Sequence, residues 1–558
     1  MTSQGFTCRL LRDAAAIDAV APEWDRLWRA RSPRHVFQGY AWHRAVLDAH
    51  PERAPCVAVV EEGERAAGLL PLWVEGRRAR FLGAPYGDYN DLLADAARAG
   101  DVLQAMLGAL DAARLGELVL ESVRGDAQLR QAAGALPPAA RRRLHCAFAA
   151  PCPTALLAAV PGVVEGVAGK KSLRRHERAL AALGPVRFRH LESREEAAAL
   201  LPAFFAQHQE RRALAGGRSL FAAPGARRFY AALVERLGLE TVRFSVLEVD
   251  GAPVAFHFGF ECDGRLVWYK PAFAVEHADL GVGEVLLGRL FAYAGARGLE
   301  ELDFTRGGEA FKDRFANAAR AVYRLTIAPP GLAGHARVLR RHLADVLRSS
   351  PLAAPLRALR SARRRARRTG AGAALAGAWR RYVHARDEVA LFHRARAAGP
   401  APPSACTLRT ATLGDLARLA SDHPERFDAG RLRAARRRLR AGDRPFLAQG
   451  EGGLVLLAWM GRRPEVAAFG EGEDAAPLLL EGEGALIDDV WAAPAGRAPE
   501  AAAEALRALA AAAPAEDVWL CADARDTALA RALGQAGFAE RRRFVRERWF
   551  RGAARVRG

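Results

Sequence analysis

Hydrophobic spacing changes three times within residues 277–315, and each change predicts a different element. Gly281 and Gly283 precede an apolar series at helical spacing, and residues 299–304 then alternate as a half-buried strand. A glycine turn follows and leads into a further helix that carries Lys312. A loop ahead of a helix exposes free N–H groups, so the pattern predicts either an anion site or an ordinary surface connection.

The same order of patterns recurs along the chain. Residues 1–150 show two helices, a strand pair, a loop, a helix and a strand, and residues 151–330 repeat this order with an Asp250-Gly251 hairpin signal. Residues 405–558 contain another small α/β pattern, whereas residues 331–404 are helical in pattern and end in a proline-rich linker. We therefore expect a mixed α/β chain with two related units, a connector and a third unit.

Charge is concentrated in the connector. Residues 331–400 hold sixteen arginines against three acidic residues, and so carry +13 of the formal +20. Arginine and alanine dominate throughout, as is typical of a GC-rich bacterial genome, so arginine abundance alone says little about function. Lysine is rare, which makes each one an uncommon choice; the four are Lys170, Lys171, Lys270 and Lys312.

Cysteine usage and hydropathy bound the cellular context. The seven cysteines are scattered without a CxxC pair, which favours a reducing cytoplasm and predicts neither a disulfide framework nor a metal site. No apolar run is long enough to span a bilayer, and the N-terminus has no apolar signal core. We expect a cytoplasmic protein, with peripheral attachment at the inner membrane left open.

Several motifs together carry a family resemblance. They are KKSLRRHER (170–178), VAFHFGF (254–260), WYKPAF (268–273), GVGEVLLGRLFAYAGARG (281–298) and LDFTRGGEAFKDRF (302–315). With these motifs the chain resembles the acetyltransferase (GNAT) superfamily in its FemAB-like, double-domain form, and more closely the CelD-like group associated with exopolysaccharide synthesis. The resemblance implies tandem GNAT-like folds in residues 1–330 and a third, degenerate GNAT-like domain in residues 405–558.

The resemblance also implies a reaction. Acyl-CoA is the usual donor, and the acceptor is an amine or hydroxyl of a sugar, polysaccharide or envelope precursor. In the Fem branch the donor is instead aminoacyl-tRNA, for which the arginines of residues 331–404 would supply phosphate contacts. A third possibility is a non-catalytic adaptor that docks through this segment on an anionic membrane surface or a polysaccharide synthase.

The donor site is expected at the glycine loop. Its N–H groups would face the phosphates of acyl-CoA, from Leu280, Gly281, Val282, Gly283 and Glu284. Lys170 and Arg174, at the start of a basic helix, would add phosphate contacts, although such a charge run is more often a solvated helix face.

Candidate catalytic and acceptor residues surround this loop. His257 is a candidate base or an inward structural histidine, and Tyr269 is a candidate acid for the leaving thiolate. Asp303, Glu309 and Lys312 surround the Gly307-Gly308 turn, where Glu309 is a second candidate base and Lys312 an anion contact, unless the two form a simple surface pair. The predicted acceptor contacts are Lys270, Gly307, Gly308, Tyr86 and Asp88.

Overall fold

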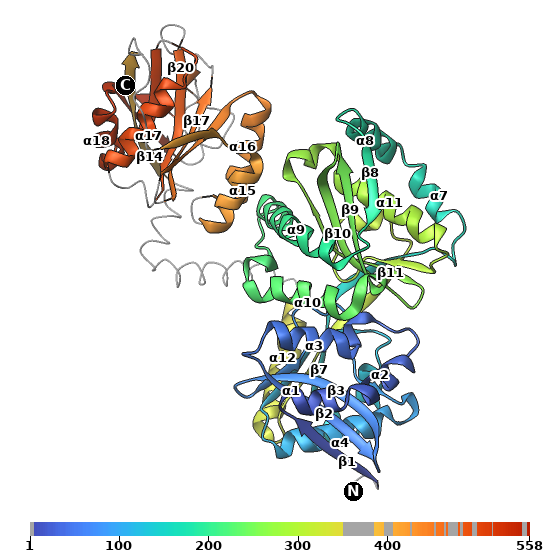
Figure 1. Cartoon of the computed structure of the whole chain (residues 1–558). Helices are drawn as coiled ribbons and strands as arrows, with labels where there is room; N and C mark the ends of the chain where they lie inside the picture. Colours follow the sequence, from blue (N-terminus) through green and yellow to red (C-terminus); the bar gives the residue numbers. More distant parts are fainter. Residues whose placement is uncertain are drawn as a thin grey trace. The chain divides into compact units, whose positions relative to one another are not determined.

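The computed structural model describes residues 5–349, 384–395, 406–423, 427–450, 453–461, 465–466, 478–479, 484–493, 499–515, 517–549 and 555–557. The chain divides into two compact units, Met1–Pro351 and Leu352–Gly558 (Figure 1). Both units are mixed α/β, as predicted. No helix in the described ranges is both long and apolar enough to cross a membrane.

The first half of the first unit follows the predicted element order. Its elements are β1 (Phe6–Leu11), α1 (Ala14–Ala19), α2 (Ala21–Arg29), η1 (Val36–Gln38), α3 (Tyr40–Ala49), β2 (Ala54–Glu62), β3 (Arg65–Glu75), β4 (Arg78–Phe81), β5 (Leu93–Ala94), η2 (Ala96–Arg98), α4 (Ala99–Ala112), β6 (Glu117–Arg124), α5 (Gln128–Ala135) and α6 (Pro138–Arg141).

The second half repeats that order after a long strand. Its elements are β7 (Leu144–Leu156), α7 (Val163–Ala168), α8 (Lys171–Ala181), β8 (Val186–His190), α9 (Arg194–Leu214), η3 (Leu220–Ala222), α10 (Pro224–Thr241), β9 (Val242–Val249), β10 (Ala252–Cys262), β11 (Arg265–Phe273), η4 (Val275–Leu280), α11 (Val282–Ala296), β12 (Glu301–Asp303), η5 (Lys312–Arg314), β13 (Ala318–Ile327) and α12 (Leu332–Ser349). The Asp250-Gly251 hairpin is confirmed: both residues have positive φ, as a type I′ turn requires, and join β9 to β10.

One sheet joins the two halves because a strand of the second half pairs with a strand of the first. Its order is β1-β2-β3-β4-β6-β13-β7-β12-β11-β10-β9-β8, with β5 beside β3. β13, the last strand of the second half, pairs antiparallel with β6 of the first half, and β7 pairs with β12 and β13. The strand β13 of the second half therefore extends the strands of the first half, and β7 lies between β13 and β12.

Helices cover both faces of this sheet. On one face α2 and α3 pack beside α9 and α10 over a core that draws Trp24 and Trp42 from the first half and Phe204 and Phe229 from the second. On the other face α4 covers the first half, and α11 covers the second half over a core that includes Leu286 (Figure 1). Because the first core is shared, the two halves form one folding unit at this junction.

The second unit has the same kind of order around its own sheet. Its elements are β14 (His384–Ala395), β15 (Thr407–Thr410), α15 (Leu413–Asp422), α16 (Ala429–Arg440), β16 (Arg444–Gly450), β17 (Gly453–Gly461), β18 (Glu465–Val466), β19 (Leu478–Leu479), β20 (Gly484–Ala492), α17 (Pro499–Ala511), β21 (Asp517–Asp523), α18 (Thr527–Gln535), β22 (Ala539–Trp549) and β23 (Arg555–Arg557). Its only parallel pair in the described residues is β20 with β21, separated by α17 along the chain.

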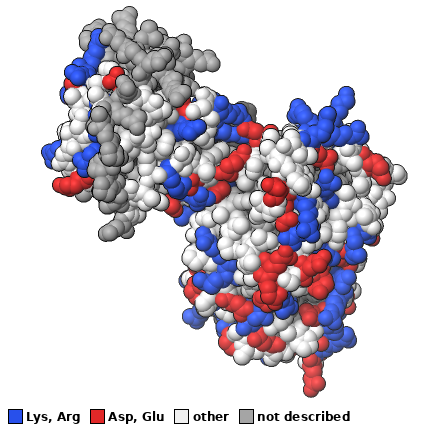
Figure 2. Space-filling view, turned by 45° about the horizontal axis from the view of Figure 1, so that its top comes forward, with Lys and Arg blue, Asp and Glu red and all other residues white. Residues whose placement is uncertain are grey.

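The four-part division of the chain stays a prediction. The boundary at residue 150 falls within β7, and α12, at the start of the expected connector, belongs to the first unit and contacts β7. Most of the arginine-rich part of the connector, residues 350–383 and 396–405, lies outside the described residues. Basic and acidic side chains are interspersed on the visible face of the first unit, with basic ones gathered near α8 (Figure 2).

Candidate functional site

The sheet opens where β11 and β12 part. These strands run parallel and pair only from Arg265↔Glu301 to Val267↔Asp303. β11 continues to Phe273 with its other edge still paired to β10. Beyond Val267, its edge toward β12 has no strand partner in the part of the chain that the structure describes. An opened parallel pair leaves backbone donors and acceptors that a ligand can use.

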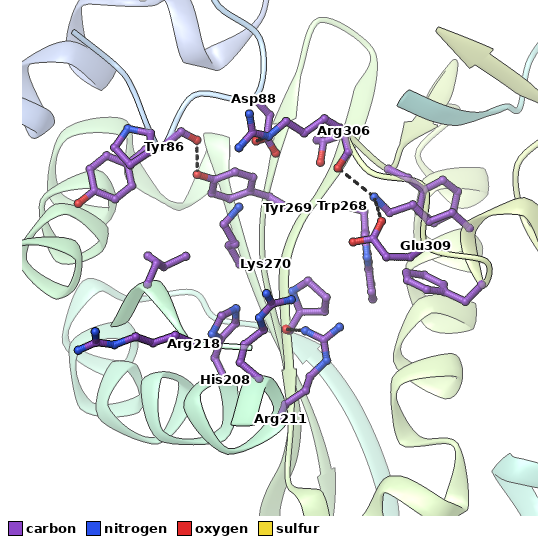
Figure 3. A pocket seen from close by; sticks show the side chains of 18 residues that line it. Tyr86, Asp88, His208, Arg211, Arg218, Trp268, Tyr269, Lys270, Arg306 and Glu309 are labelled. Atoms are coloured by element: carbon purple, nitrogen blue, oxygen red, sulfur yellow. Dashed lines mark hydrogen bonds and ion pairs between the residues drawn. The ribbon is translucent and has the colours of Figure 1, made fainter. Parts of the chain in front are cut away.

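A cavity of about 420 Å³ occupies this opening, at the junction of the two halves. That volume suits a small molecule or one end of a larger one. Four segments line it: the loop after β4, the end of α9 with the residues that follow, the end of β11, and the loop after β12 (Figure 3). The lining residues are Pro85, Tyr86, Asp88, His208, Arg211, Arg212, Arg218, Leu220, Trp268, Tyr269, Lys270, Pro271, Phe304, Thr305, Arg306, Glu309, Phe311 and Lys312.

Two polar contacts hold the loop after β4 over the second half. The Tyr269 hydroxyl donates to the Tyr86 carbonyl oxygen at 2.6 Å, and Arg306 Nε lies 3.2 Å from Asp88 Oδ1. Burial raises the pKa of Tyr269 well above its ordinary value, so its proton stays on the phenol. Tyr269 therefore positions the loop, and its hydroxyl proton is already engaged by a carbonyl.

The loop after β12 is shaped by Lys312. Its side chain is buried, and Nζ donates to the Arg306 carbonyl oxygen at 3.2 Å and lies 2.8 Å from Glu309 Oε2. The Glu309 side chain remains 57% exposed. Gly307, with a φ of 134°, and Gly308 lie within the same loop, outside the cavity lining. Glu309 and Lys312 therefore do not form a simple surface pair, because Lys312 is buried. The Lys312 ammonium is also not a free anion contact, because it is already bonded within the loop.

The prediction of a helix that carries Lys312 is wrong. The chain forms only the short 3₁₀ turn η5, in which the Lys312 N–H donates to the Glu309 carbonyl and the Phe315 N–H to that of Lys312. β13 begins at Ala318, so only this one short turn lies between the Gly307-Gly308 turn and the next strand. The strand expected at 299–304 is likewise only three residues long.

Charges in the cavity set the protonation of its acids and bases. Burial acts to raise the pKa of Glu309, but the hydrogen bond and charge of Lys312 outweigh it, and the pKa lies below its ordinary value. Burial lowers the pKa of Lys270, and the nearby cations Arg306, Lys312 and Arg212 add to this against the opposing charge of Asp88. Glu309 is therefore ionised at neutral pH, and Lys270 loses its proton more easily than an ordinary lysine.

Asp303 and His257 lie beneath the cavity. Asp303 is fully buried and accepts hydrogen bonds from the Tyr89 hydroxyl at 2.7 Å and the Thr305 N–H at 2.8 Å. His257 is fully buried and stacked on Trp268, and burial lowers its pKa to about 3. Neither lines the cavity, so the structure gives both residues supporting positions under its walls.

The predicted donor loop lies apart from the cavity, at the start of α11. Leu280 ends η4, and Gly281, Val282 and Gly283 lead into the helix. Gly281 has a φ of 66°, and a Cβ there would meet the His176 ring at 2.5 Å, so this glycine makes room for a side chain of α8.

Polar and basic groups flank this loop. Glu284 accepts hydrogen bonds from Ser172 Oγ at 2.7 Å and from Arg314 at 2.5 Å. The positive charge of Arg314 offsets the negative charge of the Glu284 carboxylate beside the helix N-terminus. Lys170 lies over the Phe315 ring at 5.3 Å, and Arg174 is exposed in the first turn of α8. The first-turn N–H groups of α11 and these bases fit a phosphate, whereas the space at Gly281 itself is taken.

The sequence did not single out the basic residues on the α9 side. Arg211 and Arg212 end α9, Arg218 follows it, and the buried His208 lies one turn earlier. Arg211 donates to the Pro271 carbonyl at 3.1 Å, which ties α9 to β11. In so arginine-rich a chain these residues carried no distinguishing signal.

The structure describes the second unit only in part. Leu533 is fully buried in the core of this unit. The loop with Gly496 and Arg497 lies outside the described residues, and Pro499 begins α17. Across the described ranges, no three His, Cys, Asp or Glu side chains are grouped to hold a metal ion.

Several solved structures are similar to the chain at low sequence identity. Among solved structures, the chain is similar to FemX (11% identity, 57% of this chain and 96% of that chain, TM-score 0.40). It is also similar to a tandem GNAT protein from the clavulanic acid biosynthesis pathway (17%, 58% and 100%, TM-score 0.38). A third similar structure is the C-terminal domain of a putative lysylphosphatidylglycerol synthetase from Agrobacterium fabrum (13%, 59% and 97%, TM-score 0.38).

No curated protein matches the chain significantly. The model of the family described as acetyltransferase (GNAT) domain matches residues 168–313. This segment contains β11, α11, β12 and the cavity residues from His208 to Lys312. The part of the chain that supplies most of the cavity is therefore the part that matches an acetyltransferase domain.

Proposed function

We propose that this protein is an acyltransferase that moves an acyl group from acyl-CoA to an amine or hydroxyl of a sugar, polysaccharide or envelope precursor. The observation that carries the proposal is the cavity between the diverging strands β11 and β12, within the segment that matches the acetyltransferase domain. In this proposal the acceptor occupies the cavity and the donor phosphates lie at the start of α11.

The residues of the cavity support direct transfer. Glu309 is an ionised, partly exposed carboxylate in the cavity wall, which suits a base that takes a proton from the attacking amine or hydroxyl. Tyr269, Lys312 and Asp303 hold the two loops that close the cavity, through their bonds to Tyr86, Arg306 and Thr305. Acyl-CoA supplies the activated thioester.

Calorimetric titration with acetyl-CoA tests the donor assignment. Gly283 is the second residue of α11, where a first-turn N–H has no helical partner, so proline removes a phosphate donor without breaking the helix. Gly283→Ala is the matched control, because both variants add a Cβ about the same distance from Phe273, 3.4 Å. We expect Gly283→Pro to weaken acetyl-CoA binding and Gly283→Ala to retain it.

The same titration separates the alternatives. Binding of bulk tRNA without acetyl-CoA would replace the proposal with a Fem-type aminoacyl transfer, in which binding falls steeply with salt. Absence of binding to either would favour a non-catalytic adaptor that docks through residues 331–404.

A further inference from the structure

Positive charge in the cavity exceeds negative charge. Six of its lining side chains are lysine or arginine and two are acidic. Arg306 is paired with Asp88, and Lys312 with Glu309. The remaining four form what we call the basic cluster: Arg211, Arg212, Arg218 and Lys270. In the described part of the chain, none of these four forms a salt bridge with an acidic side chain.

The basic cluster is held in place from several segments. The Arg211 guanidinium donates to the Pro271 carbonyl at 3.1 Å and lies over the Phe273 ring, and Lys270 Nζ lies 3.5 Å from the centre of the Tyr269 ring. Asp88 and Arg306 lie across the cavity from His208 and Arg211, with Lys270 between them (Figure 3). Cations fixed by such contacts, and not by carboxylates, keep their charge available to a ligand.

His208 adds no charge to the cluster. Its Nδ1 is 2.8 Å from Ser219 Oγ, and burial, followed by the charges of Arg211 and Lys270, lowers its pKa to about 2. The imidazole is therefore neutral, and the excess of four positive charges is that of arginine and lysine side chains alone. A single carboxylate would leave most of this charge uncompensated, whereas a phosphate ester or diphosphate carries two or more negative charges.

The cluster lies on the opposite side of the sheet from the expected donor phosphates. Arg211 and Arg212 are on α9, which packs on the face whose core includes Phe204 and Tyr269. α11, whose first turn faces the donor in the proposed function, packs on the other face with Trp268. In the proposed function the two anion sites belong to two different substrates, and β11 and β12, which pair only as far as Val267 and Asp303, lie between the two faces.

We propose that the basic cluster binds a phosphate or diphosphate group of the acyl acceptor. This inference rests on the proposed function and specifies its acceptor as a phosphorylated one. The phosphate would contact Arg211, Arg212 and Lys270 with Arg218 beside them, and Glu309 in the facing loop would then meet the accepting amine or hydroxyl of the same molecule.

Binding of inorganic pyrophosphate and of a sugar 1-phosphate to the full chain tests this inference. We expect both to bind, and Arg212→Gln to weaken binding about tenfold or more, as loss of a charge-assisted contact implies. Arg194→Gln is the matched control, since Arg194 is in the first turn of the same helix, exposed and paired with Glu235. It should bind pyrophosphate as the wild type does, and both variants should retain acetyl-CoA.

The outcomes separate this inference from the proposed function. Gly283→Pro should lose acetyl-CoA and keep pyrophosphate, the reverse of Arg212→Gln. The inference is overturned if neither phosphate probe binds at millimolar concentration, if Arg212→Gln binds within twofold of wild type, or if pyrophosphate and acetyl-CoA exclude each other. Loss of acetyl-CoA in Arg212→Gln would overturn it as well, by assigning the cluster to the donor.

A second comparison identifies the source of the phosphate. Vesicles of phosphatidylglycerol, measured by sedimentation against neutral phosphatidylcholine vesicles, represent a lipid-linked acceptor. Vesicle binding that Arg212→Gln weakens would support the inference with a lipid-borne phosphate, and binding of the soluble probes alone would support it with a soluble acceptor.

Discussion

Replacement of Tyr89 by phenylalanine tests how the two halves build the cavity together. Tyr89 comes from the first half, and its hydroxyl donates to Asp303 Oδ1 at 2.7 Å, 214 residues further along the chain. The same oxygen accepts the Thr305 N–H, while Oδ2 has no hydrogen-bond partner among the described residues. Thr305 has a φ of 54° and begins the loop that carries Arg306, so the bond supports the turn that shapes the cavity wall.

The expected cost follows from the charge and burial of Asp303. A hydrogen bond to a charged group contributes about 1.5–3 kcal/mol, and Tyr89→Phe leaves Asp303 with one hydrogen bond in place of two. The unfolding entropy of a unit of this size corresponds to about 1–2 °C per kcal/mol. We expect the melting temperature of the first unit to fall by about 2–5 °C.

The direction in which the effect of Tyr89→Phe changes with pH follows from the pKa of Asp303. Burial raises the pKa of Asp303, and the Tyr89 hydrogen bond opposes that rise. Ionisation of Asp303 therefore destabilises the folded state as pH increases through this raised pKa, and loss of Tyr89 enlarges that effect. The melting-temperature difference between wild type and Tyr89→Phe should be larger at pH 8 than near pH 4.

Scanning calorimetry measures this difference, and Asp303→Asn provides the control background. Against an uncharged side chain the same substitution should cost only about 0.5–1.5 kcal/mol, as for a neutral hydrogen bond. A Tyr89→Phe effect below about 0.5 kcal/mol, or one equal at both pH values and undiminished in Asp303→Asn, would refute the reasoning.

Three further predictions follow from the cavity and the sheet. Pyrophosphate affinity should fall as pH rises, because Lys270 loses its proton. Since the pKa of Lys270 is lowered, this fall should begin at a lower pH than for an ordinary lysine, and Lys270→Arg should abolish it in a calorimetric pH series. A double-mutant cycle should show that Lys312→Met lowers the free energy of unfolding more than Glu309→Gln does, because Lys312 also bonds the Arg306 carbonyl. The coupling energy between the two substitutions should be about 1 kcal/mol or less, because Glu309 is exposed, and a larger coupling would contradict this. A fragment of residues 1–143 should show no cooperative thermal transition, since β6 loses its partner β13; a sharp transition would show that the half folds alone.

The sequence predicted the order of elements because periodicity is local. Helical spacing after Gly283 gives α11, and the Asp250-Gly251 turn gives the β9–β10 hairpin with its register. The pairing of strands that lie far apart in the sequence was beyond such reasoning. β7 pairs with β12 and β13, more than 140 residues away, and an alternating strand does not specify its neighbour.

The candidate site was predicted only in part, because the packing of side chains, like the pairing of strands, is not determined locally in the sequence. Tyr86, Asp88, Tyr269, Lys270 and Glu309 line one cavity with Lys312, although they come from three distant segments. Their residue types and positions at strand ends and turns singled them out. Whether a polar side chain is open or buried depends on packing, which is why the sequence could not separate these residues from the buried Asp303 and His257.

Basic residues were predicted least well. The glycines of the loop at 280–284 predict a phosphate site, yet Gly281 accommodates His176. Arg211 and Arg212 lie in the last turn of α9, where cations commonly complement the helix dipole, so their position indicates no site. Only the folded arrangement, in which β11 and the loop after β12 bring other cations beside them, shows the excess charge.

The rate of thiol release from acetyl-CoA in the presence of phosphorylated amino sugars and sugars tests the central claim most directly. We predict release that depends on the acceptor and falls about 10²–10⁴-fold in Glu309→Gln, the loss expected for a general base, with acetyl-CoA affinity unchanged. Release that no acceptor stimulates, or a Glu309→Gln variant as active as the wild type, would contradict acyl transfer at this cavity.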